Sequence, residues 1–264
     1  MERQAMMFSG KVVAVTGAAG GIGQALCRHF AAEGAAIAAL DVNPKVASFA
    51  KEISAAKVVH AIADVGDSAA VAEAFEHITA ALGPVDILIN NAGFSEHPTF
   101  ASTDPAAWQH DVNGNLNGAY YCAHAVVPEM KARGGGSIIA IGSVNGLGAL
   151  GDPAYSAAKA GMISLTRSLA LEYGRFGIRA NAVLPGTVRT PLWERRAARA
   201  PEVLAKLIRW YPLGRIVEPV DVAHAAAFLA SDAAAAITGV ALPVDCGLSA
   251  GNIVMARELT LEDF

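Results

Sequence analysis

Residues Lys11–Gly23 read KVVAVTGAAGGIG, an apolar, β-branched run that passes directly into a glycine-rich turn. The run is typical of a buried strand, and the apolar spacing of residues 21–33 predicts a helix straight after the turn. Glycines in such a turn let backbone N–H groups approach a phosphate closely at the positive end of a helix. The segment therefore predicts a strand–loop–helix unit that binds a dinucleotide.

Asp41 stands 18 residues after Gly23, at the end of the next apolar run, Ala35–Leu40. A carboxylate at this place can accept hydrogen bonds from both ribose hydroxyls of an adenosine, but it repels a 2′-phosphate. Neither Gly20 nor Val42 supplies a cation that could offset the repulsion. The sequence therefore favours NAD over NADP as the cofactor.

The same alternation of short apolar runs with longer helical runs continues along the chain. Strands are expected at Lys11–Thr16, Ala35–Leu40, Val58–Ala63, Ile87–Asn90, Ser137–Ile141, Ile178–Leu184 and Val240–Val244. Helices are expected at Gly21–Glu33, Pro44–Ala55, Ser68–Leu82 with Ser68 as the cap, Asp104–Arg133, Pro153–Tyr173, Pro191–Trp210 and Pro219–Ala230. Apolar strands separated by helices indicate a parallel sheet covered on both faces. We expect an α/β protein over 1–264, a single Rossmann-type domain with a doubly wound, seven-stranded parallel sheet, ending in a tail at 245–264.

Composition excludes several other classes of protein. With 53% hydrophobic and 17% charged residues, the chain is not intrinsically disordered. A net charge of −4 gives no electrostatic case for a nucleic-acid partner. Three widely spaced cysteines, no metal-ligand spacing among seven histidines, and no apolar signal segment at the start lead us to expect a cytoplasmic protein without a metal or a membrane partner.

Tyr155 and Lys159 are four residues apart on an expected helix, so their side chains share a face. An ammonium about 4 Å from the phenol, at an effective dielectric of about 20, supplies about 4 kcal/mol, enough to lower a tyrosine pKa by about three units. Desolvation opposes this lowering and a positively charged nicotinamide ring assists it. Ser143 follows the strand Ser137–Ile141, at the edge where open α/β sheets bind ligands. Taken singly, the three residues would be a helix cap, a packed ring and a solvated cation; together, behind a nucleotide loop, they predict a proton-transfer site.

The chain resembles the short-chain dehydrogenase/reductase family. The residues that carry the resemblance are Thr16–Gly23, Asn90-Asn-Ala-Gly93, Ser143, Tyr155-Ser-Ala-Ala-Lys159 and Pro185-Gly186, in the order typical of the family. The resemblance implies a twisted seven-stranded sheet, nicotinamide-dependent chemistry at an alcohol or carbonyl carbon, and commonly a tetramer.

The resemblance also assigns roles to individual residues. Gly17, Gly21 and Gly23 are expected to shape the turn that binds the pyrophosphate, and Ile22 is expected to contact the cofactor. Asp64 and Val65 are expected at the adenine, and Asn91, followed by Ala92 and Gly93, near the adenosine ribose. Val188 and Thr190 are expected to meet the nicotinamide carboxamide, and the further expected cofactor contacts are Pro185, Gly186, Tyr155 and Lys159. Asn115, seven residues after Trp108, would hold a water between Lys159 and solvent and complete a tetrad with Ser143 and Tyr155, although Asn113 and Asn117 are close alternatives.

Two positions depart from the family pattern. Only 12 residues separate Ser143 from Tyr155, one fewer than we expect, so the loop between them should differ. Cys246 stands where the family often has glycine, which puts the geometry of that turn in doubt.

In this family the segment after Pro185-Gly186 covers the substrate, so 190–215 is expected to be a lid. Residues 189–209 hold six cations and two glutamates, a net charge of +4 that would favour an anionic substrate, with Arg195, Arg196 and Arg199 as candidate contacts. The alternative is that these arginines only solvate the outer face of a helix. Asn145, in a wall that also includes Leu147, Leu150 and Asp152, hints at a hydroxylated substrate.

We therefore expect an NAD-dependent dehydrogenase that acts on a secondary alcohol or its ketone, on a small polar compound that is anionic or polyhydroxylated. A 3-oxoacyl thioester reductase is the alternative enzyme, and a non-catalytic NAD-binding regulator is the alternative of another class. The presence of both Tyr155 and Lys159 argues against a non-catalytic regulator. Small and apolar side chains on the helices Asp104–Arg133 and Pro153–Tyr173 are expected to pair across a two-fold axis in a homo-oligomer, with a tetramer favoured, and Gly251–Phe264 is expected to reach towards a neighbouring subunit.

Overall fold

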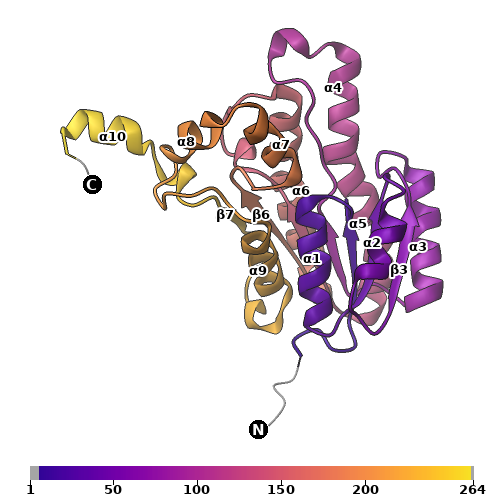
Figure 1. The fold of residues 1–264 in the computed structure, drawn as a ribbon. Coiled ribbons are helices and arrows are strands. Elements are labelled where there is room, and N and C mark those ends of the chain that lie inside the picture. Colours follow the sequence, from indigo (N-terminus) through magenta and orange to yellow (C-terminus); the bar gives the residue numbers. More distant parts are fainter. Residues whose placement is uncertain (1–5, 263–264) are drawn as a thin grey trace.

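The structure is a computed structural model that describes residues 6–262; residues 1–5 and 263–264 of the expected domain and tail lie outside the described part. Its seven strands form one parallel sheet in the order β3-β2-β1-β4-β5-β6-β7 (Figure 1). The strands are β1 (Val12–Thr16), β2 (Ala36–Asp41), β3 (Val58–Ile62), β4 (Ile87–Asn90), β5 (Gly136–Ile141), β6 (Ile178–Pro185) and β7 (Ala241–Val244). The order reverses between β1 and β4, so a crevice opens at the carboxyl ends of these two strands. The expected fold class is confirmed.

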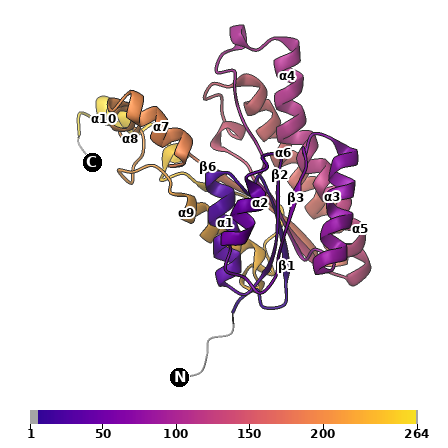
Figure 2. The same cartoon turned by 45° about the vertical axis from the view of Figure 1, so that its right-hand side comes forward.

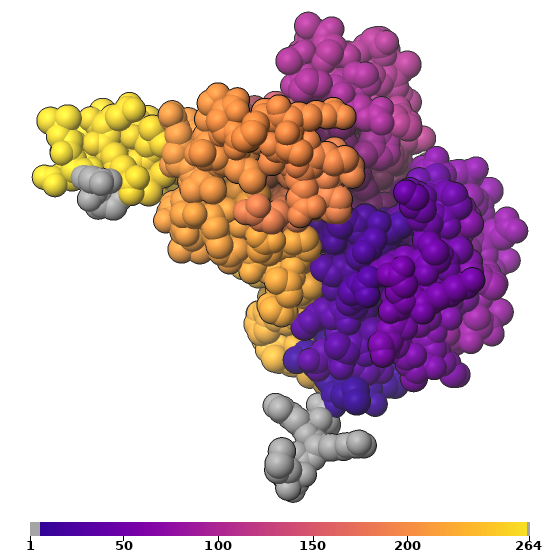
Figure 3. All heavy atoms as spheres, in the orientation of Figure 1, coloured from indigo at the N-terminus to yellow at the C-terminus, as the bar shows by residue number. Residues whose placement is uncertain are grey.

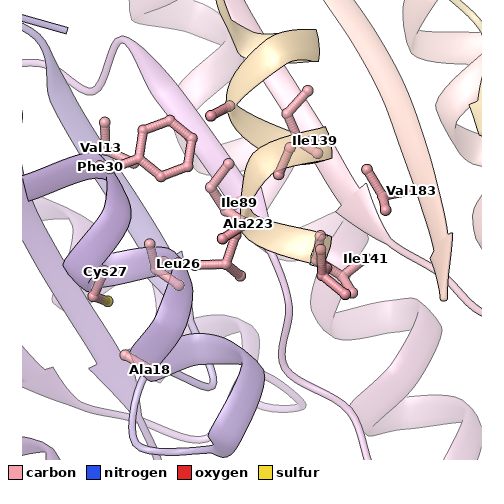
Figure 4. Packing of buried hydrophobic residues seen from close by; sticks show 14 of the residues in the cluster. Val13, Ala18, Leu26, Cys27, Phe30, Ile89, Ile139, Ile141, Val183 and Ala223 are labelled. Atoms are coloured by element: carbon pink, nitrogen blue, oxygen red, sulfur yellow. The ribbon is translucent and has the colours of Figure 1, made fainter. Parts of the chain in front are cut away.

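Helices cover both faces of the sheet (Figures 1 and 2). One face packs against α1 (Gly21–Ala32), α2 (Val46–Glu52) and α9 (Pro219–Ala230), and the other against α3 (Ser68–Leu82), α5 (Gly118–Arg133) and α6 (Pro153–Tyr173). The strands serve both faces because successive side chains alternate: Val13 points to the first layer and Ala14 to the second. Figure 4 shows Leu26 and Phe30 of the first layer among the sheet residues.

The helix expected over Asp104–Arg133 is interrupted. It consists of α4 (Pro105–Val112), a π-helical turn at Asn113–Asn117, and α5. Within the turn, the Asn115 side-chain nitrogen donates to the carbonyl oxygen of Asp111 at 2.9 Å, and the Gly118 N–H reaches back five residues to Asn113. When a side chain forms a hydrogen bond with a backbone carbonyl oxygen inside a helix, the turn widens. The prediction of one continuous α-helix is therefore wrong at this turn.

The segment Pro191–Trp210 is two helices, α7 (Pro191–Arg199) and α8 (Glu202–Ile208). Pro201 causes the break, because it disfavours helical backbone at the preceding Ala200, whose φ is −140°. The cap of α3 is Asp67 rather than the expected Ser68: the Asp67 carboxylate accepts from the N–H groups of Ala69 and Ala70 at 2.9 and 3.2 Å. A side chain reaches the second and third N–H groups only from the residue before the helix.

The predicted tail contains α10 (Ile253–Thr260), which projects from the body beyond α8 (Figures 1 and 3). Short 3₁₀ turns lie at Phe100–Ser102, Val144–Gly146, Gly174–Phe176, Asp232–Ala234 and Leu248–Ala250. Within residues 6–262, no helix combines the length and apolar character needed to cross a bilayer.

All three cysteines are buried and unpaired. Burial raises the pKa of Cys27 and that of Cys122 to about 12, and it also raises the pKa of Cys246. Cys246 has a φ of 54°, in the left-handed region that favours glycine. The turn therefore takes the geometry that a glycine would give it, although a side chain is present.

Candidate functional site

A pocket of about 760 Å³ lies at the carboxyl ends of β1, β2 and β4; we call it the glycine-loop pocket. The expected cofactor residues that line it are Gly17, Gly21, Ile22, Gly23, Asp41, Asp64, Val65, Asn91, Ala92, Gly93 and Thr190. A Cβ on Gly23 would clash with the carbonyl oxygen of Gly17, and one on Gly17 would lie 2.8 Å from Cα of Ala92. The loop therefore folds tightly only with glycine, and it places the first turn of α1 at the pocket. This shape and these backbone donors fit a dinucleotide pyrophosphate.

The loop is tied to the strand beside it. Thr16 Oγ1 accepts from the N–H groups of Asn91 and Ala92, each at 3.0 Å. The Asn91 side-chain nitrogen donates to the carbonyl oxygens of Thr16 and Gly17 at 2.9 and 3.1 Å. The first residues after β4 thus hold the glycine loop, a structural contact that the resemblance to the family did not supply.

The Asp41 carboxylate is fixed at the edge of this pocket. Its two oxygens accept from the N–H groups of Ala19 and Asn43 at 2.9 and 2.8 Å, and the residue is only 9% exposed. Two exposed cations also line the pocket, Lys45 and Arg195. Sequence reasoning missed Lys45, which stands only four residues after Asp41, and it assigned Arg195 to the substrate.

A second pocket of about 870 Å³ adjoins the first; we call it the tyrosine pocket. Its expected residues are Ser143, Asn145, Leu150, Asp152, Tyr155, Pro185, Gly186, Val188, Thr190 and Arg196. Sequence reasoning missed much of its apolar wall, formed by Trp193, Leu207, Trp210, Tyr211 and Leu248. Leu147 is 52% exposed and is not among the lining residues. Ile22, Thr190 and Leu192 line both pockets, so the two are continuous beneath α7.

Tyr155 and Ser143 both line the tyrosine pocket, near enough for the Ser143 hydroxyl to lower the pKa of the Tyr155 phenol. Lys159, one helical turn along α6, is almost fully buried; its Nζ donates to the carbonyl oxygen of Ile141 at 3.0 Å and lies 5.5 Å from the centre of the Tyr155 ring. The structure thus brings the three expected groups together at the end of β5.

The pKa of Tyr155 is raised, opposite to the expected direction. Desolvation is the main cause, the hydrogen bond from Ser143 opposes it, and the carboxylate of Asp152 adds to it. Burial lowers the pKa of Lys159 to about 8. We expected the attraction between the two groups to outweigh desolvation; in the folded protein, loss of hydration is the larger effect and disfavours both charged forms.

Asn115 is fully buried beside this group. Its side-chain nitrogen donates to the carbonyl oxygen of Phe94 at 2.8 Å, and its Oδ1 accepts from the Phe94 N–H at 3.3 Å. A Cβ on Gly93 would lie 2.6 Å from Asn115 Oδ1 and 3.1 Å from Lys159 Nζ, so both side chains border Gly93. Asn113 and Asn117, the alternatives, instead bond to each other at 2.6 Å.

The three lid arginines face different surroundings. Arg196 lines the tyrosine pocket with its guanidinium 4.7 Å from the Trp193 ring, Arg195 lines the glycine-loop pocket, and Arg199 lines neither. Within residues 6–262, none of the three forms an ion pair. In the same part of the chain, Arg196 and Asp152 are the only charged residues that line the tyrosine pocket.

No group of histidine, cysteine or acidic side chains within the described range is arranged to hold a metal ion.

Comparisons with known proteins show similarity to oxidoreductases over most of the chain. A family model described as enoyl-(acyl carrier protein) reductase matches residues 17–249. An oxidoreductase of the short-chain dehydrogenase/reductase family from Burkholderia thailandensis is 50% identical, with a TM-score of 0.90 over 96% of this chain and 98% of that one.

Two further relatives carry more specific names. The cis-4-hydroxycyclohexanecarboxylate dehydrogenase of Sinomonas cyclohexanicum is 39% identical over 92% of this chain and 98% of that protein. A gluconate 5-dehydrogenase from Burkholderia cenocepacia J2315, solved in complex with NADP and tartrate, is 34% identical, with a TM-score of 0.87 over 94% of this chain and 98% of that one.

Proposed function

Because the chain belongs to the short-chain dehydrogenase/reductase family, we propose that it transfers a hydride between NAD and a secondary alcohol or its ketone. The observation that carries the proposal is that Tyr155 and Ser143 line one pocket, with Lys159 beside Tyr155, and that this pocket is continuous with the glycine loop. A proton-transfer group and a dinucleotide cradle that share one cavity suit oxidation at an alcohol carbon.

The proposed roles follow from chemistry and position. Ser143 donates a hydrogen bond to the substrate oxygen, and Tyr155 takes the proton of the alcohol in oxidation or returns it in reduction. Lys159, when charged, stabilises the tyrosine anion, and Asn115 holds a water that connects Lys159 to solvent. A bound nicotinamide would supply the hydride acceptor or donor. Pro185, Gly186, Val188 and Thr190 would hold that ring, while Asp64 and Val65 would hold the adenine.

We propose NAD rather than NADP on the strength of Asp41. Its carboxylate is held in place by two backbone N–H groups, so it cannot easily turn away from a 2′-phosphate. The cations at the same pocket, Lys45 and Arg195, are exposed and can move on long side chains. A fixed negative charge at short range should outweigh mobile, solvated positive charges. The related gluconate 5-dehydrogenase, solved with NADP, makes this choice worth a direct test.

The proposed substrate is a small polar compound with an anionic group, bound under a lid formed by residues 190–215. Arg196 supports this because its guanidinium has no acidic partner within residues 6–262 and lines the tyrosine pocket. A planar fork of donors suits a carboxylate. Two relatives are named for hydroxy acids, 4-hydroxycyclohexanecarboxylate and gluconate. Asn145 was expected to contact substrate, but its side chain forms hydrogen bonds with Ser143, Gly151 and Ser156.

A test panel follows from these proposals: cis-4-hydroxycyclohexanecarboxylate, gluconate, the uncharged analogue cyclohexanol, and an acetoacetyl thioester for the alternative thioester reductase. Oxidation of an alcohol is followed as formation of NADH at 340 nm. Reduction of the thioester is followed as loss of NADH at the same wavelength. Tyr155→Phe removes the proton-transfer group while keeping the ring, and it should lower turnover at least about 100-fold. A Tyr155→Phe variant that keeps most of the wild-type turnover would refute the proposed mechanism.

A further inference from the structure

We propose that Asn145 is a positioning residue that controls which way the Ser143 hydroxyl donates its hydrogen, an inference that rests on the proposed function. Asn145 lies in the 3₁₀ turn Val144–Gly146, directly after Ser143. Its Oδ1 accepts from the Ser143 hydroxyl at 3.3 Å, and its backbone N–H donates to Ser143 Oγ at 3.1 Å. One residue thus contacts the serine oxygen as donor and as acceptor.

The far end of the same side chain is anchored on the loop before α6. Asn145 Nδ2 donates to the carbonyl oxygen of Gly151 at 3.4 Å and to Ser156 Oγ at 3.1 Å. The Ser156 hydroxyl itself donates to the Gly151 carbonyl at 2.7 Å, so its oxygen is free to accept. Both partners of Nδ2 need a donor, which orients the amide and leaves Oδ1 facing Ser143.

This bridge compensates for the short spacing between Ser143 and Tyr155. The chain turns into α6 through two residues of positive φ, Gly151 at 92° and Asp152 at 49°, and no side chain caps the helix. Asn145 links the turn that carries Ser143 to the beginning of the helix that carries Tyr155. The two reacting hydroxyls are therefore fixed relative to each other by a side chain that belongs to neither.

The bridge also sets a competition for one hydrogen atom. Ser143 has a single O–H, which can point to Asn145 Oδ1, to a Tyr155 anion or to a substrate oxygen. When the hydrogen points to Asn145, Ser143 can only accept from Tyr155, which favours the protonated tyrosine. Within residues 6–262, the charged groups that adjoin Tyr155 or line its pocket are Asp152, whose carboxylate favours the same protonated form, and Lys159 and Arg196, whose cationic groups oppose it.

Two substitutions should therefore move the protonation of Tyr155 in opposite directions. Asn145→Ala removes the competing acceptor, so Ser143 is free to donate to the tyrosine anion, and the acid limb of the pH profile for alcohol oxidation should shift to lower pH. Asn145→Asp replaces the amide with a carboxylate, and the same limb should shift to higher pH. A side chain that only supports the fold would not reverse the shift between these two variants.

A double-mutant cycle with Ser143 tests whether Asn145 acts through that residue. The substrate is whichever compound of the panel the wild type converts fastest. At a pH above the acid limb of both proteins, we expect Asn145→Ala to lower kcat about tenfold, because the Ser143 hydroxyl loses the two contacts that fix its position. KM should stay within about twofold, and the substitution should have no further effect in the Ser143→Ala background. Leu147→Ala, at the exposed side chain two residues along, is the matched control and should leave kcat unchanged.

Three outcomes would overturn the inference. Equal losses in both backgrounds would show that Asn145 acts independently of Ser143. A raised KM with unchanged kcat would show direct contact with substrate. If the wild type converts no compound of the panel with either NAD or NADP, the proposed function itself is contradicted. This result is distinguishable from the other two, in which the wild type is active.

Discussion

Lys159→Met should stabilise the folded protein while it removes activity. Nζ of Lys159 is buried, and burial lowers its pKa from 10.5 to about 8. At about 1.4 kcal/mol for each pKa unit, keeping this ammonium charged in the folded protein at pH 7 costs about 3 kcal/mol. Methionine has a similar length and no charge, but it loses the 3.0 Å hydrogen bond to the carbonyl oxygen of Ile141, worth about 1 kcal/mol. We expect a net gain of about 2 kcal/mol in unfolding free energy at pH 7.

The pH dependence identifies the cause of this gain. Below pH 8 the lysine is charged in both the folded and the unfolded chain, so the full cost is present. Between pH 8 and 10.5 the folded protein releases the proton while the unfolded chain keeps it, so the cost falls to zero. Urea unfolding of wild type and variant should therefore give a difference that shrinks from pH 7 to pH 10.5.

A matched control is Lys206→Met, whose side chain is 73% exposed and which should change stability by less than about 0.5 kcal/mol at every pH. A Lys159→Met variant less stable than wild type at pH 7, or a difference that does not vary with pH, would refute the reasoning.

Three further predictions concern ligands and assembly. At equal concentrations, NADH should raise the melting temperature more than NADPH, and Asp41→Ala should narrow the gap; a larger shift with NADPH would contradict the choice of NAD. Arg196→Ala should lower kcat/KM at least about tenfold on cis-4-hydroxycyclohexanecarboxylate but not on cyclohexanol, with Arg199→Ala as the matched control; small, equal losses on both compounds would mean that the arginine only solvates the lid. Light scattering at micromolar concentration should show a homo-oligomer, with a tetramer as our proposal; a mass near 27.1 kDa would exclude it.

The strands and the order of layers could be predicted because the strands are nearly all apolar and helical runs separate them. Chain order then limits how parallel strands can connect. The glycine loop could also be predicted from the sequence, because only glycine fits at position 23, where a Cβ would clash with the carbonyl oxygen of Gly17. Ser143, Tyr155 and Lys159 come together as expected because the end of β5 and one face of α6 fix their places.

What the sequence could not supply depends on contacts between distant segments. The π-helical turn arises where the Asn115 side chain donates a hydrogen bond to the backbone carbonyl oxygen of Asp111. The spacing of apolar residues in the sequence does not predict this hydrogen bond. The raised pKa of Tyr155 follows from surrounding protein that excludes water, and the extent of that burial depends on segments far from Tyr155 and Lys159 in the sequence. Arg195 and Arg196 are adjacent in sequence, yet they line different pockets because successive helical side chains point about 100° apart.

The burial of the cysteines has a practical consequence for chemical labelling. All three thiols lie inside the fold, and at neutral pH their raised pKa values keep them protonated and slow to react with maleimides. A cysteine introduced at Ala198, an exposed position on α7, would therefore react selectively with a fluorescent dye while every native cysteine is retained. Emission from that dye would then report ligand arrival beneath α7 in real time, independently of any turnover assay.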